Sequence, residues 1–245
     1  MGTRKSASDR ASRDLWAEQI AALAAKGATK SRKAPITVDR VVDAALSIVE
    51  ADGFDALTMR GVIAALLAGP GSVYAQVRDK AELDDRMIGV LCSRVTVPVP
   101  DPARWKEQAL DVCRQLRDQY LRYPGISRAA MDAAPHNLEA LRLTEGLLAI
   151  LTSGGASVQA AAWVSDAAFQ YVGSYSIVSR RRGPQGDTHG VVVDRDELIA
   201  RFRMLPPDLF PIIAKHAPEV TSSEGHERFE FTLGLLLGGL GSTTS

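Results

Sequence analysis

The chain has 245 residues, 46% of them hydrophobic, which is typical of a globular protein with a sizeable core. Basic and acidic residues number 29 each, and the resulting net charge of zero excludes a uniformly basic nucleic-acid coat protein. Neither of the two cysteines, Cys92 and Cys113, belongs to a CxxC pair, which argues against a zinc ribbon or a redox motif.

Segments that would send the chain to a membrane are not visible in the sequence. Polar residues follow Met1 where a signal peptide needs an apolar stretch. The longest apolar run, "LGLLLGGL" at 233–240, is far shorter than the roughly 20 residues of a spanning helix. We therefore expect a cytoplasmic protein with reduced cysteines and no membrane partner.

The first 35 residues are a basic arm, with eight lysine or arginine residues against three acidic ones. A short amphipathic helix is predicted at 14–27, between polar flanks. Such an arm contacts phosphates or a minor groove in some DNA-binding proteins and is a solvated tail in others, and both readings stay open here. The cations concerned are Arg4, Lys5, Arg10, Arg13, Lys26, Lys30, Arg32 and Lys33.

Helix signals become dense after the arm. Thr37 is a candidate N-cap, apolar residues follow it at helical spacing, and Gly53 stands where helices commonly end. Thr58 is the next candidate N-cap and opens a predicted helix over 59–67.

A break then interrupts the helical pattern at Gly69, Pro70 and Gly71, before a predicted helix over 71–77. Glycine allows a positive φ in such a turn, and proline favours the first position of the next helix, where its missing N–H is not needed. The break turns the chain so that the second helix can cross the first, which is the arrangement of a helix-turn-helix.

Asp79 and Glu82 form a capping signal for a helix from 80 to about 95. The proline-rich stretch "VTVPVPDP" at 95–102 follows as the natural domain boundary. Beyond it, helical patterns recur at 102–122, 125–133, 137–152, 157–181, 195–204, 207–216 and 225–240.

The predicted fold class is therefore all-α. A loop is expected at 183–190, and the strand-like run at 191–193 is too short for a sheet. We assign a basic arm to 1–35, a three-helix helix-turn-helix domain to 36–95, and a larger C-terminal helical bundle to 96–245.

The stretch 38–85, "VDRVVDAALSIVEADGFDALTMRGVIAALLAGPGSVYAQVRDKAELDD", resembles the tetracycline-repressor (TetR) family of bacterial transcriptional regulators. Its family-like marks are "AALSIVEADGFDALTMR", Tyr74 late in the second helix and Lys80 at the start of the next. The sequence departs from the family at Leu67, where members carry the first glycine of the turn. If that turn is kept, Leu67 should adopt a backbone conformation unusual for leucine.

The resemblance implies which residues contact DNA. Tyr74 and Lys80 match the family's phosphate contacts, and Thr58 and Arg60 match its backbone and groove-edge contacts. Ser72 and Gln76 can hydrogen-bond base edges, with Gln76 standing where histidine is frequent in the family. The full candidate set is Thr58, Arg60, Gly69, Pro70, Gly71, Ser72, Tyr74, Ala75, Gln76 and Lys80, with Arg32 and Lys33 of the arm. Ordinary capping, surface charge and, for Tyr74, core packing are the alternatives.

For the C-terminal domain the resemblance implies an inducer pocket and a dimer formed by the last two long helices. These would be the predicted helices 157–181 and 225–240. Candidate ligand-binding residues are Trp105, Met131, Leu147, Trp163, Phe169 and Gln170, although core packing explains aromatic residues equally well.

The sequence thus favours a homodimeric, ligand-responsive regulator, expected to be a repressor that a small-molecule inducer releases from a double-stranded DNA operator. No cofactor is expected. An enzyme is disfavoured because the four histidines lack metal-ligand spacing and no GxSxG or Walker A motif occurs. A helical protein-interaction module or a small-molecule carrier with a degenerate helix-turn-helix remains the alternative.

Overall fold

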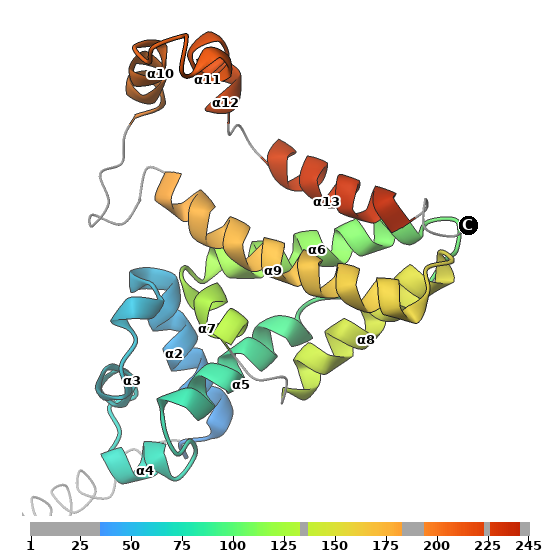
Figure 1. Ribbon diagram of the computed structural model, residues 1–245. Coiled ribbons are helices and arrows are strands. Elements are labelled where there is room, and N and C mark those ends of the chain that lie inside the picture. Colours follow the sequence, from blue (N-terminus) through green and yellow to red (C-terminus); the bar gives the residue numbers. More distant parts are fainter. Residues whose placement is uncertain (1–34, 133–136, 183–193, 223–225, 241–245) are drawn as a thin grey trace, which may run out of the picture. The chain divides into compact units, whose positions relative to one another are not determined.

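The computed structural model describes residues 35–132, 137–182, 194–222 and 226–240. Every regular element in these ranges is a helix, which confirms the all-α class (Figure 1). Several sequence predictions lie outside the described residues, namely the helix at 14–27, the loop at 183–190, the run at 191–193, and Arg32 and Lys33.

The first helix, α2 (Val38–Asp52), has the limits that its capping residues predict. The Thr37 hydroxyl accepts a hydrogen bond from the Arg40 N–H, and Gly53 adopts φ 84 at the other end. One face of α2 is buried and forms the centre of the N-terminal core. Its members are Val41, Val42, Ala45, Leu46 and Val49.

A short 3-10 turn, η1 (Phe54–Ala56), leads into the two helices of the predicted helix-turn-helix, α3 (Met59–Ala65) and α4 (Pro70–Tyr74). The Thr58 hydroxyl caps α3 by accepting from the Gly61 N–H at 3.0 Å. The helix α4 is shorter than the predicted 71–77, but Pro70 occupies its first turn as expected.

The next helix, α5 (Lys80–Ser93), begins as predicted, with the Asp79 carboxylate accepting from the Glu82 N–H at 2.8 Å. This helix contacts both α2 and the C-terminal helices. It therefore joins the two halves of the fold, and α2 to α13 belong to one packed unit.

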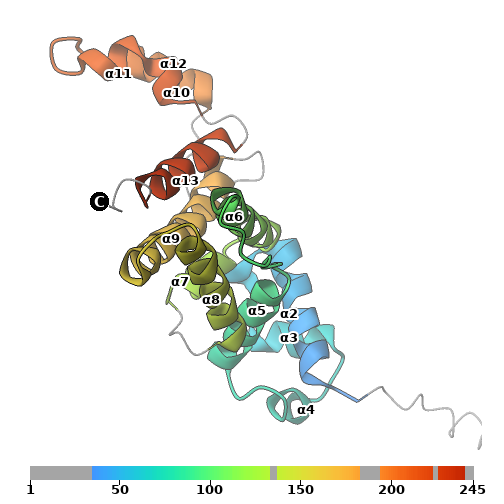
Figure 2. The same ribbon diagram turned by 90° about the vertical axis from the view of Figure 1, so that its right-hand side faces the viewer.

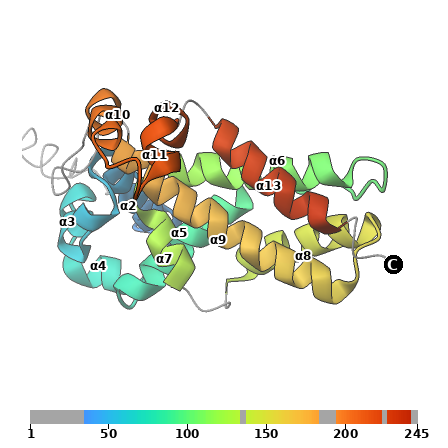
Figure 3. The same ribbon diagram turned by 45° about the horizontal axis from the view of Figure 1, so that its top comes forward.

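Four helices form the body of the C-terminal bundle: α6 (Trp105–Arg122), α7 (Ile126–Asp132), α8 (Leu138–Ser153) and α9 (Val158–Arg182). The helix α9 packs against the other three and against α13 (Glu227–Leu240), beside which it runs in Figures 1 and 3. Their buried residues include Val112, Leu116, Leu147, Val172 and Phe229.

Three shorter helices, α10 (Arg195–Arg203), α11 (Pro211–Lys215) and α12 (Ala217–Val220), lie between α9 and α13 in the chain and pack on one another. The single helix predicted at 207–216 is wrong over its first half. Pro211 has no N–H to donate to an earlier turn, so a helix begins there instead of running through it.

The contact between α5 and α8, visible in Figures 1 and 2, depends on Asn137. Its side-chain carbonyl caps α8 by accepting from the N–H groups of Glu139 and Ala140, while its amide donates to the Asp85 carbonyl of α5 at 2.8 Å. A Cβ at Gly89 would lie 2.7 Å from the Asn137 amide nitrogen, so a larger residue there would displace the Asn137 side chain. Asn137 thus connects the start of α8 to α5.

The two thiols are buried, and burial raises the pKa of Cys92 to about 11 and that of Cys113 to about 12. Because the thiolate is the reactive form, we expect neither cysteine to react with an aromatic disulfide reagent in the folded protein at pH 8. In the denatured protein both thiols should react with the reagent in the same assay. Rapid reaction of one thiol in the native protein would contradict this burial.

Candidate nucleic-acid interface

The turn between α3 and α4 is closed by Leu67, which has φ 48, the left-handed conformation. Its N–H donates to the Ala64 carbonyl, and the Ala68 N–H donates to the Ile63 carbonyl. These two bonds define a Schellman motif, whose left-handed position glycine usually occupies. The family's turn is therefore kept, and leucine adopts the backbone conformation that was expected of it.

Glycine does not supply the positive φ of this turn, and that part of the sequence prediction is wrong. Gly69 has φ −72 and stands at the N-cap of α4. A Cβ at Gly69 or Gly71 would meet no atom within 4 Å. Both glycines thus leave open space at the leading end of α4 instead of shaping the turn.

The surface of α4 is accessible and carries the hydroxyl groups of Ser72 and Tyr74 among small residues. Val73 and the following Val77 are buried and attach this segment to the core, while Gln76 is half-buried. Tyr74 is 48% exposed, so core packing does not account for it. The exposed candidates are Gly69, Pro70, Gly71, Ser72, Tyr74 and Ala75.

The remaining candidates flank α4. Thr58 and Arg60 are exposed at the start of α3. Lys80 is half-buried at the start of α5, where its ammonium donates to both carboxylate oxygens of Asp84, at 2.6 and 2.9 Å. Its position is therefore defined by a partner within the same helix.

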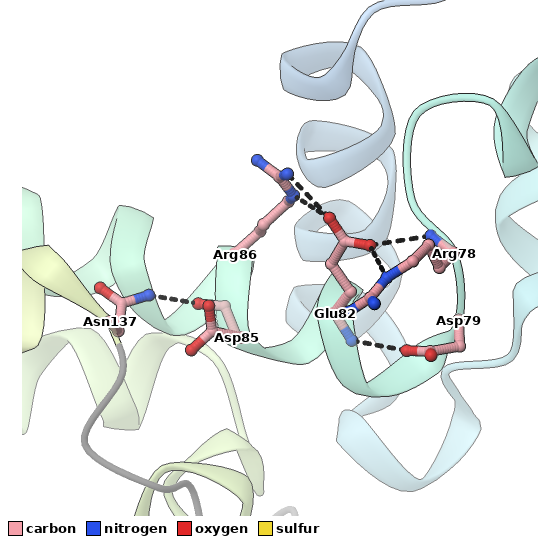
Figure 4. A network of polar contacts seen from close by, with 6 residues as sticks. All are labelled: Arg78, Asp79, Glu82, Asp85, Arg86 and Asn137. Carbon is pink, nitrogen blue, oxygen red and sulfur yellow. Dashed lines mark hydrogen bonds and ion pairs between the residues drawn. The ribbon is translucent and has the colours of Figure 1, made fainter.

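The loop between α4 and α5 is held by Glu82, as Figure 4 shows. One Glu82 oxygen accepts from the Arg78 N–H at 2.9 Å and from the Arg78 side chain, and the other accepts from Arg86. The Arg78 N–H and then the two guanidinium groups lower the pKa of Glu82 to about 2. The carboxylate is thus ionised at neutral pH and fixes the loop that follows α4.

Sequence reasoning assigned Glu82 only a capping role and did not find its ion pairs. The four-residue spacing of Glu82 and Arg86 within α5 was a usable signal, since such residues are neighbours on a helix surface. Arg78 lies before the N-cap of α5 and gave no such signal. Asn137 and Phe54 gave no comparable signal, because their partners are distant in sequence.

Of the six candidate ligand residues, Trp163 alone is among the residues that line a hollow between α9 and α13. Leu147 is buried, Trp105 packs against Gly154, and Gln170 is exposed and donates to Asp166 at 2.9 Å. Met131 lies against Gly173, and Phe169 is half-buried.

Trp163 lines a hollow of about 640 Å³ between the start of α9 and the end of α13. The indole is 68% exposed. Ala160 and Val164 of α9 and Leu236, Gly239 and Leu240 of α13 are among the other lining residues. Leu235, 63% exposed, and Phe231 continue the apolar surface along α13. The two helices expected to form a dimer therefore share an accessible apolar face.

The described residues hold neither a metal-binding cluster nor a helix that could span a membrane. They contain no cluster of three or more His, Cys, Asp or Glu side chains arranged to hold a metal ion. None of their helices combines the length and the apolar character needed to cross a membrane.

Comparison with known proteins agrees with this geometry. The family described as "Tetracyclin repressor-like, C-terminal domain" matches residues 98–244. The structure of apo ActR from Streptomyces coelicolor is 34% identical, covers 84% of this chain and 95% of its own, and has a TM-score of 0.75. ActR in complex with actinorhodin has a TM-score of 0.77 at 34% identity, with coverage of 85% and 98%.

Curated relatives match over shorter stretches. The HTH-type transcriptional repressor DrrR1 of Streptomyces coeruleorubidus is 35% identical over 40% of this chain and 37% of its own length. An HTH-type transcriptional regulator of Saccharopolyspora erythraea is 29% identical over 51% of this chain and 54% of its own. The matches thus span about a third and about half of these two relatives.

The helix-turn-helix followed by an all-α bundle defines a one-component transcriptional regulator. The chain belongs to the TetR family of these regulators.

Proposed function

We propose that this protein is a ligand-responsive repressor that binds a near-palindromic operator as a homodimer and leaves it when a small molecule binds. The observation that carries the proposal is α4, whose surface is exposed while Val73 holds it on the core. In helix-turn-helix proteins such a helix enters the major groove with its N-terminal end. The ActR complex with actinorhodin supports a small-molecule inducer, and the protein would act in the bacterial cytoplasm.

Each part of the chain has a role in this proposal. Residues 1–35 are the basic arm, 36–95 the DNA-binding domain, and 96–245 the ligand-binding and dimerisation domain. Ser72 and Gln76 contact base edges, and the small residues beside them leave room for close approach. Phosphate and groove-edge contacts come from Thr58, Arg60, Tyr74 and Lys80.

The dimer would form through the apolar face of α9 and α13. A two-fold interface needs projecting and hollow features on the same surface, and this face carries both Trp163 and the hollow that it lines. Two α4 helices would then lie about 34–36 Å apart, one turn of DNA, on two half-sites.

A mobility-shift assay with the DNA upstream of the protein's own gene tests the proposal. We expect binding below micromolar at low salt, weakening steeply as salt rises. Failure to bind any site at that concentration would favour a protein-interaction or carrier function instead.

Tyr74→Phe should weaken this binding about tenfold, because the phenol loses a hydrogen bond to a charged phosphate. The dependence of affinity on salt should stay unchanged, since the hydroxyl is neutral. Tyr120→Phe makes the same chemical change at a buried position of α6 and serves as the matched control. Equal affinities of the Tyr74 and Tyr120 variants would remove Tyr74 from the interface.

A further inference from the structure

Phe54 of η1 contacts Lys80, a residue of the proposed DNA interface. The Lys80 ammonium is 4.0 Å from the centroid of the Phe54 ring, a cation–π contact. Together with the two hydrogen bonds to Asp84, this contact holds the ammonium between an aromatic face and a carboxylate. The position of the Lys80 charge therefore depends on where the Phe54 ring lies.

The C-terminal bundle determines where Phe54 lies. The Phe54 N–H donates a hydrogen bond to the Pro124 carbonyl, in the turn between α6 and α7, at 2.8 Å. The next residue, Gly125, has φ 88, and a Cβ there would lie only 3.2 Å from the Phe54 Cβ. The turn thus fits closely against η1 at a position where both the backbone and the space favour glycine.

Two ion pairs flank this contact. Arg128 of α7 pairs with Asp55 of η1 at 3.3 Å, and Arg122 of α6 pairs with Glu50 of α2 at 3.1 Å. All four side chains are largely exposed, so these pairs add little stability. They do orient the α6–α7 turn on both sides of the Phe54–Pro124 hydrogen bond.

We propose that Phe54 is a positioning residue that transmits the position of the Pro124–Gly125 turn to the Lys80 ammonium. The inference rests on the proposed function, in which Lys80 contacts a DNA phosphate. A shift of the α6–α7 turn moves the ring, and the ammonium then loses its alignment with the phosphate. The C-terminal domain in this way regulates one ionic contact with DNA.

The contact is tested by comparing Phe54→Leu, which removes the aromatic face, with Phe54→Tyr, which keeps it. Affinity for the protein's own upstream DNA is measured in the full-length chain over a range of salt concentrations. The slope of log K against log salt is negative, and loss of one lysine–phosphate contact makes it shallower by about 1. We expect Phe54→Leu to weaken binding about three- to tenfold and to make the salt dependence shallower, as Lys80→Gln does. Phe54→Tyr should keep the wild-type affinity and salt dependence.

The double variant, Phe54→Leu with Lys80→Gln, separates positioning from general loosening. If Phe54 acts through Lys80, the double variant binds like Lys80→Gln alone. Additive losses, or an unchanged salt slope in Phe54→Leu, would overturn the inference. Absence of DNA binding by the wild-type protein would instead overturn the proposed function.

Gly125→Asn tests the transmission from the C-terminal side. Asparagine tolerates the left-handed backbone better than other residues with a side chain, so the variant adds a side chain against Phe54 with little backbone strain. We expect the affinity of this variant to depend on salt as weakly as that of Phe54→Leu. A lower melting temperature with an unchanged slope would show that the α6–α7 turn does not act on Lys80.

Discussion

Leu235→Glu is expected to turn the proposed homodimer into monomers and to lower its affinity for a two-half-site operator at least a hundredfold. Leu235 is exposed on α13, on the same helical stripe as Phe231 and Gly239. In a symmetric dimer the substitution buries two carboxylates, and each costs several kcal/mol without a partner, against 1.4 kcal/mol for a tenfold change.

Sedimentation velocity over a range of protein concentrations measures the effect. Val99→Glu is the matched control, because Val99 is 87% exposed and lies before α6, away from the α9 and α13 sequences. That variant should sediment like the wild type. A Leu235→Glu protein that remains dimeric at the same concentrations would place the interface elsewhere.

Leu67→Gly is expected to stabilise the protein by about 1 kcal/mol, although it removes a large apolar side chain. A left-handed residue with a Cβ costs about 1–2 kcal/mol, and glycine returns part of this gain through the entropy of the unfolded chain. The side chain is 75% exposed, so its removal sacrifices little packing. For a domain of this size the melting temperature should rise by about 2–4 °C.

Thermal unfolding with Leu67→Ala as the control checks the cause. Alanine also removes the side chain beyond Cβ but keeps the strained backbone, so it should not raise the melting temperature. Equal stabilities of the glycine and alanine variants would show that φ 48 at Leu67 carries no strain.

Much of the fold was predictable because local interactions determine it. The caps at Thr37, Thr58 and Asp79 lie within three residues of the N–H groups they satisfy, and each helix begins where they indicate. The unusual conformation of Leu67 was predicted on the condition that the turn of the family is kept, and φ 48 meets that condition. The first half of the helix predicted at 207–216 is wrong because apolar periodicity continues across Pro211, where the helix in fact begins.

The candidate site was less predictable where contacts join distant segments. Phe54 and Pro124 are 70 residues apart, and Asn137 is 52 residues from Asp85, so no periodic pattern could reveal either pair. The choice of ligand residues stays a prediction, and Trp163 alone of the six lines the hollow between α9 and α13. Helical spacing selects a face but does not say whether that face meets a cavity, a neighbouring helix or solvent.

The shared role of Asn137 has a mechanical consequence. Sliding α8 along α5 would pull the Asn137 amide from the Asp85 carbonyl or its carbonyl from the start of α8, so the two helices are locked in register. Arg142 of α8 adds to this coupling by donating to the carbonyl of Cys92 in the last turn of α5 and to that of Val95 just beyond it. We therefore expect α5 and α8 to move together as one rigid body, with any bending of the structure occurring outside their contact.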